Sequence, residues 1–159
     1  MDELLELLCR NALETPADLA RMLDISEDDV RCRIREYEAK GVIRGYQAIV
    51  DEDSLDTDIV TAVVEIKVTP EREGGFDRTA ARVSRFPEVD SLYLMSGTYD
   101  LLAMVRGRDL REIATFVSAK LATIEGVLST ATHFMLKAYK KQGVLMEDSP
   151  SDERLQVSP

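Results

Sequence analysis

Cysteine and histidine are nearly absent from this chain of 159 residues, which has two cysteines, Cys9 and Cys32, and one histidine. Two thiols are too few for a disulfide framework, so we expect a reduced chain in the cytoplasm. A single histidine outside any His/Cys cluster argues against a structural or catalytic zinc site. The sequence also lacks a nucleophile motif, a phosphate-binding loop and a G-x-G-x-x-G pattern. It therefore predicts no enzyme activity, no metal site and no cofactor.

Long hydrophobic runs are missing as well. No stretch approaches the roughly 20 apolar residues of a membrane-spanning helix, so no membrane partner is expected. The acidic start Met1-Asp2-Glu3 does not resemble a secretory or transit signal. Only five residues are proline, whereas 45% are apolar and 31% are charged. This composition excludes a disordered chain and supplies enough apolar surface for a folded core.

Positive charge is in deficit, because 20 basic and 30 acidic residues give a net charge of −10. A protein with this charge repels polyanions at long range, so nucleic-acid binding would need a local basic surface. Residues 1–45 carry 7 basic and 11 acidic residues, a local net charge of −4. The net charge alone therefore does not favour a DNA-binding unit.

The first 45 residues nevertheless have the pattern of a helix-turn-helix with one helix before it. Apolar spacing and capping residues predict a helix near 2–12, a second from Thr15 and a third from Ser26 to Gly41. The last two helices can cross closely because Ala20 is small. A small helical bundle without a role in DNA binding is the alternative that this spacing leaves open.

The third helix carries the residues that could contact DNA. Val30, Ile34 and Tyr37 are spaced to form its buried face. The cations of the helix and its exit are Arg31, Arg33, Arg35, Lys40 and Arg44. Arginine suits phosphates and guanine edges because its guanidinium makes two parallel hydrogen bonds. The alternative is an exposed face of salt bridges between these cations and nearby carboxylates.

The rest of the chain alternates between predicted strands and helices. We expect a strand at 42–50 and an acidic linker at 51–58. The segments after the linker are strand 61–68, helix 76–86, strands 89–96 and 101–107, helix 109–121 and strand 127–137. This β-α-β-β-α-β order predicts a ferredoxin-like sheet with both helices on one face. The uncovered, partly apolar face is expected to pack on another subunit.

The turn Ser96-Gly97-Thr98-Tyr99-Asp100 is a candidate ligand site. Gly97 lets the backbone approach a ligand closely. Backbone N–H groups and the Thr98 hydroxyl could hold a carboxylate, while Asp100 could accept an ammonium group. The hydroxyls of Thr130 and Thr132 share one face of the last strand and could add contacts. The alternative is a plain tight turn in which the Asp side chain caps its own backbone.

Together these segments resemble the Lrp/AsnC family of transcriptional regulators. The resemblance rests on ISEDDVRCRIREYEAKGVIRGYQAIV, LYLMSGTYDLLAMVRG and IEGVLSTATHFMLK, which follow the order and spacing of the family over about residues 1–140. It implies an α+β fold with an N-terminal winged-type helix-turn-helix and a C-terminal ferredoxin-like βαββαβ (RAM) domain. It also implies homodimers or higher oligomers, including octamers, that bind double-stranded DNA and small effectors, usually amino acids.

Carried over by position, the resemblance assigns roles to named residues. The DNA contacts are Ser26, Arg31, Arg33 and Arg35. The effector contacts are Gly97, Thr98, Tyr99 and Asp100, with Thr130 and Thr132 opposite. The acidic stretch Glu27-Asp28-Asp29 departs from the neutral start that is common in the family's recognition helix.

The predicted segments divide the chain into four parts. These are a helix-turn-helix domain at 1–45, a strand and acidic linker at 46–58, an effector-binding and oligomerisation domain at 59–142, and an acidic tail at 143–159. The function expected is a sequence-specific, effector-modulated transcription regulator. The alternative is an amino-acid sensor or partner subunit that has the same fold but does not bind DNA.

Overall fold

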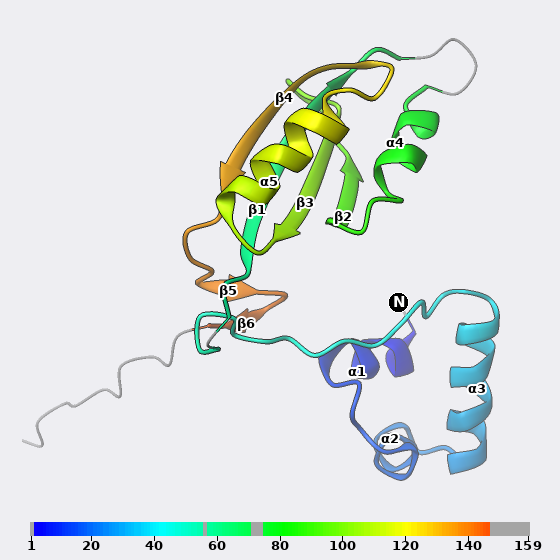
Figure 1. Cartoon of the computed structure of the whole chain (residues 1–159). Helices are drawn as coiled ribbons and strands as arrows, with labels where there is room; N and C mark the ends of the chain where they lie inside the picture. Colours follow the sequence, from blue (N-terminus) through cyan, green and yellow to red (C-terminus); the bar gives the residue numbers. More distant parts are fainter. Residues whose placement is uncertain (1, 56, 71–74, 147–159) are drawn as a thin grey trace, which may run out of the picture. The chain divides into compact units, whose positions relative to one another are not determined.

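The computed structural model describes residues 2–55, 57–70 and 75–146 (Figure 1). The chain divides into two compact units, residues 1–48 and 49–159. Across the described residues, no helix combines the length and the apolar character needed to cross a membrane.

The first unit consists of three short helices, α1 (Glu3–Arg10), α2 (Pro16–Leu23) and α3 (Glu27–Ala39). Side-chain caps set the starts of the last two helices, as predicted. The hydroxyl of Thr15 accepts from the backbone N–H of Asp18 at 3.1 Å, and that of Ser26 accepts from Asp29 at 3.1 Å. These caps satisfy N–H groups that have no partner inside the helix. The first helix ends two residues earlier than expected.

The core of this unit confirms the predicted crossing of α2 and α3. Ala20 is buried at the crossing, and Asp24 adopts the left-handed conformation with a φ of 53°. Val30 is fully buried, whereas Ile34 and Tyr37 are half-buried and pack against the same core. The remaining buried side chains of the unit are Leu4, Leu8 and Leu19.

The strand predicted at 42–50, which includes the strand part of the 46–58 segment, is wrong. The segment is an irregular extended stretch, and Val42 and Tyr46 on it are exposed. Its β-branched and aromatic residues have high strand propensity, but a strand also needs a neighbouring ladder. Within the described residues, no other segment pairs with it.

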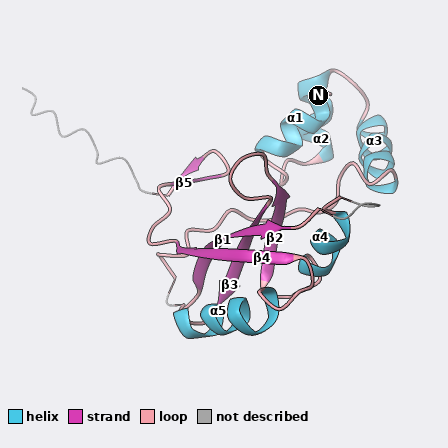
Figure 2. Ribbon diagram, turned by 90° about the horizontal axis from the view of Figure 1, so that it is seen from above, coloured by secondary structure: helices cyan, strands magenta, loops and turns pink. Residues whose placement is uncertain are grey.

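The second unit contains a four-stranded antiparallel sheet in the order β2-β3-β1-β4. Its elements are β1 (Val60–Val68), α4 (Asp77–Val83), β2 (Val89–Leu94), β3 (Leu101–Gly107), α5 (Leu110–Phe116) and β4 (Val127–Phe134). A π-helical turn, Val117–Leu121, continues α5. Helix α5 packs on β3 and α4 packs on β2, and Figure 2 shows α5 along one side of the sheet. The predicted β-α-β-β-α-β order is confirmed.

One face of the sheet is buried beneath both helices. Ala62, Val64 and Ile66 of β1 are completely buried there. The helices cover them with Val83, Ile113, Phe116 and Leu121. Asp109 begins α5 by accepting from the backbone N–H of Glu112 at 2.7 Å, as predicted. The core of this unit therefore lies between the sheet and its two helices.

The last strand and the tail differ from the prediction. Strand β4 ends at Phe134, and a short hairpin follows in which β5 (Lys140–Lys141) pairs with β6 (Val144–Leu145). Gln142 and Gly143 form its turn with φ values of 48° and 89°. The start of the predicted tail thus belongs to this hairpin, whereas residues 147–159, which include Ser149-Pro150, lie outside the described residues.

Candidate functional site

The exposed surface of α3 has two of its predicted cations tied to carboxylates. Arg31 forms an ion pair with Glu27, and Lys40 Nζ lies 2.9 Å from Glu36 Oε2. Both partners are one helical turn earlier, at i−4, where such pairs form readily. All four side chains remain well exposed. Arg31 and Lys40 therefore form the exposed salt bridges that the sequence analysis gave as the alternative to DNA contacts.

Arg33 and Arg35 are exposed and form no ion pair within the described part of the chain. Arg33 lies on the flank of α3 that faces the start of α1. There Tyr37 donates a hydrogen bond to the Asp2 carboxylate, and this bond lowers the pKa of Asp2 and raises that of Tyr37. The positive charge of Arg33 also helps to lower the pKa of Asp2. Arg35 is on the outer side of the helix, opposite its buried face.

The two remaining DNA-contact candidates lie at the ends of α3. The Ser26 hydroxyl is occupied, because it accepts from the backbone N–H of Asp29 and donates to the Asp29 carboxylate at 2.7 Å. Arg44 folds back over the turn after α3. A Cβ on Gly41 would lie 3.0 Å from the guanidinium carbon of Arg44, and Gly41 has a φ of +67°. Arg44 is exposed beyond this contact.

The turn at residues 96–100 closes the hairpin between β2 and β3. The backbone N–H of Met95 donates to the carbonyl of Asp100 at 2.8 Å. Gly97 has a φ of +138°, which favours glycine, and a Cβ there would meet no atom within 4 Å. The space above Gly97 and the exposed Thr98 is therefore open. Tyr99 beside them is half-buried.

Asp100 ties this turn to the end of β1. Its carboxylate oxygen Oδ2 accepts from the backbone N–H of Val68 at 2.8 Å, and its own N–H donates to the carbonyl of Ile66 at 3.1 Å. The Asp100 side chain thus accepts from the backbone of β1, whereas the tight-turn alternative predicted that it would cap the backbone of its own turn. The second carboxylate oxygen has no hydrogen-bond partner among the described residues.

Thr130 and Thr132 lie on the helix-covered side of the sheet. In the register of β1 and β4 they are opposite Ile66 and Val64, whose side chains are in the core. Both threonines are half-buried. The end of β3 next to Asp100 and the β4 segment with Thr130 flank Ile66 on its two sides, so they are separated by two strand spacings, roughly 10 Å. The sheet brings the turn and Thr130 to one end without direct contact.

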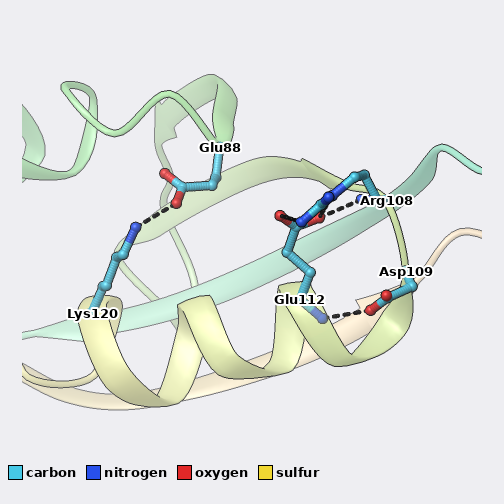
Figure 3. Close-up of polar contacts among 5 residues, drawn as sticks. All are labelled: Glu88, Arg108, Asp109, Glu112 and Lys120. Carbon is cyan, nitrogen blue, oxygen red and sulfur yellow. Dashed lines mark hydrogen bonds and ion pairs between the residues drawn. The ribbon is translucent and has the colours of Figure 1, made fainter.

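A hollow of about 390 Å³ beside α5 was not predicted from the sequence. Figure 3 shows two ion pairs among the residues that line it, Lys120 with Glu88 and Arg108 with Glu112. Lys120 Nζ lies 2.6 Å from Glu88 Oε1, and Arg108 lies 3.3 Å from Glu112 Oε1. The hydrogen bond from Lys120 lowers the pKa of Glu88. Glu88 and Lys120 are 32 residues apart, so no local pattern links them. The Lys120 ammonium also lies 5.7 Å from the centre of the Phe116 ring.

The other face of the sheet is not covered by α4 or α5. Val63 lies opposite Met104, and Tyr93 lies opposite Leu102. His133 is on this face too, opposite Val63, and its Nε2 lies 3.5 Å from Glu65 Oε1. The uncovered face thus mixes apolar and charged side chains. Among the described residues there is no group of three His, Cys, Asp or Glu side chains suited to a metal ion.

Comparison with known proteins agrees with this arrangement. Residues 61–145 match the Lrp/AsnC ligand binding domain. An uncharacterized HTH-type transcriptional regulator of Bacillus subtilis, YugG, is 44% identical over 99% of this chain and 95% of its own length. The chain belongs to the Lrp/AsnC family.

Solved structures of transcriptional regulators have the same fold. An AsnC family transcriptional regulator from Agrobacterium tumefaciens is 30% identical, with a TM-score of 0.68 over 91% of this chain and 96% of that chain. The complex of the Neisseria meningitidis regulator NMB0573 with L-Met is 24% identical, with a TM-score of 0.69 over 89% of this chain and 93% of that one. This Lrp/AsnC chain is therefore a helix-turn-helix transcriptional regulator, a class of protein distinct from enzymes.

Proposed function

We propose that this regulator binds double-stranded DNA through α3 and that an amino-acid-like effector, bound near the turn at 96–100, changes its DNA affinity. The observation that carries the proposal is a capped helix-turn-helix in one unit and an open glycine turn in the other, within a chain of the Lrp/AsnC family. In this proposal the predicted helix-turn-helix domain at 1–45 binds DNA, and the predicted domain at 59–142 binds the effector. Such a regulator acts where the chromosome is, in the cytoplasm.

The support for DNA binding comes from the arginines that no carboxylate holds. Arg33 and Arg35 are both exposed. Arg33 lies on a flank of α3 and Arg35 on its outer side, so Arg33 can contact phosphate while Arg35 faces the groove. Arg31, Lys40 and Arg44 are exposed on α3 or just after it, so they can add phosphate contacts. Arg31 and Lys40 can do so while they remain paired with Glu27 and Glu36, or by leaving these carboxylates. A local net charge of −4 opposes binding by one subunit. A dimer places two such helices on one duplex and doubles the favourable contacts.

The support for an amino-acid effector is the chemistry around Gly97. An α-amino acid has a carboxylate and an ammonium group, and both must be satisfied when water is removed. The open backbone at Gly97 and the Thr98 hydroxyl can donate to the carboxylate, while the second oxygen of Asp100 can accept from the ammonium. Thr130 at the same end of the sheet can reach the far side of a small ligand. The relative NMB0573 is known in complex with L-Met.

Homodimers, and larger assemblies of them up to octamers, complete the proposal. The uncovered sheet face with Val63, Tyr93 and Met104 is the surface we assign to the dimer, because exposed apolar side chains bordered by polar ones, here Glu65 and His133, often mark a surface that packs on another subunit. An effector bound between subunits would bias the assembly and so the spacing of the α3 pairs. Regulation then follows from linkage between two binding sites.

A salt titration tests the part of this proposal that concerns DNA binding. The affinity of the full chain for duplex DNA should fall linearly on a log–log plot against salt, with a slope of about −0.9 for each phosphate contact. The double variant Arg33→Ala/Arg35→Ala should bind more weakly with a shallower slope. Arg85→Ala/Arg111→Ala, which removes two exposed arginines of the second unit, is the matched control and should bind like the wild type.

The second candidate function is an amino-acid sensor or partner subunit without DNA binding. It is favoured by the pairing of Arg31 with Glu27 and of Lys40 with Glu36, which reduces the positive potential of α3. Under this alternative, calorimetry detects an amino acid while no duplex binds even at low salt. DNA binding that depends on salt and on Arg33 and Arg35 excludes it.

A further inference from the structure

The side of α3 opposite its buried face includes residues other than the cations considered so far. At about 100° per residue, the side opposite Val30 and Ile34 is centred on Asp28, Cys32 and Arg35. All three are exposed. In a helix-turn-helix, the second helix of the motif places this side in the major groove, with its N-terminal residues at the base edges.

Apart from Arg33, which lies on the flank that faces α1, the other charged side chains along α3 have partners. Glu27 pairs with Arg31, the Asp29 carboxylate accepts from Ser26, and Glu36 pairs with Lys40. Glu38 accepts from the Tyr46 hydroxyl at 3.1 Å. Within the described residues, neither Asp28 nor Arg35 has an ion pair or a side-chain hydrogen bond. Their hydrogen-bonding groups are therefore open on the surface that faces a bound duplex.

We propose that Asp28 and Arg35 are the pair that reads the bases, so that the recognised half-site has a cytosine and a guanine about three base pairs apart. This inference rests on the proposed DNA binding. For a helix axis that runs along the groove, the seven residue steps from Asp28 to Arg35 span roughly 10.5 Å, the length of about three base-pair steps of 3.4 Å. Arg35 donates two hydrogen bonds to the O6 and N7 atoms of guanine.

The chemistry of Asp28 limits the base it accepts. An ionised carboxylate has only acceptors, and the major-groove donors are the amino groups of cytosine and adenine. Cytosine is the better match, because the N7 acceptor beside the amino group of adenine repels the second carboxylate oxygen. Guanine and thymine present acceptors at the corresponding edge and are rejected. Asp28 therefore contributes discrimination between sequences.

The same carboxylate lowers the affinity for all DNA, since it brings negative charge towards the phosphates. The Asp28 carboxylate should thus increase the discrimination between base sequences and decrease the affinity for unrelated DNA. A carboxylate that only stabilises the helix N-terminus through the helix dipole changes the affinity for the selected site and for unrelated DNA by the same factor. This difference in sign separates a base-reading role from a structural one.

The experiment selects duplexes from a random pool with the full-length wild-type chain at low salt. It then measures the affinity for the selected site and for sites changed at single positions. We expect a cytosine whose replacement weakens binding about 10- to 100-fold. Asp28→Ala should abolish that preference and raise the affinity for unrelated DNA several-fold. Asp28→Asn should shift the preference to adenine, because an amide pairs with the N6 and N7 atoms of adenine.

Glu6→Ala on α1 is the control of equal charge, and it should leave the base preference unchanged. Circular dichroism must show wild-type helix content for each variant, and Asp28→Asn, which keeps the side-chain shape, serves if Asp28→Ala unfolds. Salt-dependent binding with the same preferences in wild type and both Asp28 variants overturns this inference and leaves the proposed function standing. A wild-type chain that binds no duplex at low salt overturns both.

Discussion

Replacing Asp100 separates two roles that the structure gives to one carboxylate. One oxygen accepts from the backbone N–H of Val68 at 2.8 Å, and the other is open beside the turn at 96–100. Asp100→Ala removes both groups. Asp100→Asn retains an oxygen that can accept from Val68 but removes the negative charge that an ammonium group requires. The two variants should therefore differ in stability and agree in their loss of effector binding.

The magnitude follows from the hydrogen bond that Asp100→Ala breaks. A hydrogen bond to a charged group contributes about 1.5 to 3 kcal/mol, and the partner left behind is the N–H of a buried strand residue. Asp100 is only half-buried, so water replaces part of the contact and the lower end applies. We expect a loss of about 1.5 kcal/mol, which lowers the Tm of a domain of roughly 100 residues by about 8 °C. Asp100→Asn should stay within about 0.5 kcal/mol of wild type.

Urea unfolding gives the stabilities, and calorimetry with a panel of amino acids gives effector binding. Both variants should bind the effector at least 10-fold more weakly, which corresponds to about 1.4 kcal/mol, while DNA binding in the absence of effector is unchanged. Effector binding by Asp100→Asn that equals wild type would refute the placement of the ammonium group. An Asp100→Ala chain as stable as wild type would refute the structural role.

Three further predictions concern single contacts. Ala20→Glu should unfold the first unit, because a buried unpaired charge costs several kcal/mol, and a thermal melt that matches wild type would contradict the crossing of α2 and α3. Gly97→Val should lose the effector response while DNA binding persists, since a φ of +138° is strained for a β-branched residue; unchanged calorimetric heats would place the pocket elsewhere. The lowered pKa of Glu88 means that its contribution to stability is present above the ordinary carboxyl pKa and is lost as the pH falls through the folded value. Lys120→Met should therefore destabilise the chain more at pH 7 than at pH 3 in thermal melts, and an equal loss at both would exclude the ion pair as the cause.

Local signals in the sequence predicted the helix starts correctly. Thr15, Ser26 and Asp109 each cap the helix that follows them, because a capping side chain needs only the next three residues. The ion pairs of Arg31 and Lys40 could also have been predicted individually, since Glu27 and Glu36 precede them by four residues. Each of these features depends only on residues within one or two helical turns, which is why the sequence can specify it.

Features that depend on distant segments were not accessible in the same way. The segment 42–50 has strand composition, but no described segment of the chain forms a ladder with it. Alternation showed that Thr130 and Thr132 share a face, yet only the register with β1 shows that this is the helix-covered face. The Asp100 carboxylate accepts from the N–H of Val68, which is 32 residues away, so the sequence of the turn does not indicate this hydrogen bond. Tertiary pairing, which sequence spacing does not specify, decides all three.

The most direct test of the whole account measures the affinity of the full chain for a selected duplex, over a range of salt concentrations, with each amino acid in turn. The account predicts salt-dependent binding and at least one amino acid that changes the DNA affinity by about 5- to 150-fold, with the same factor in the effect of DNA on the affinity for that amino acid. Equal DNA affinity with every amino acid, or no binding at low salt, would contradict it.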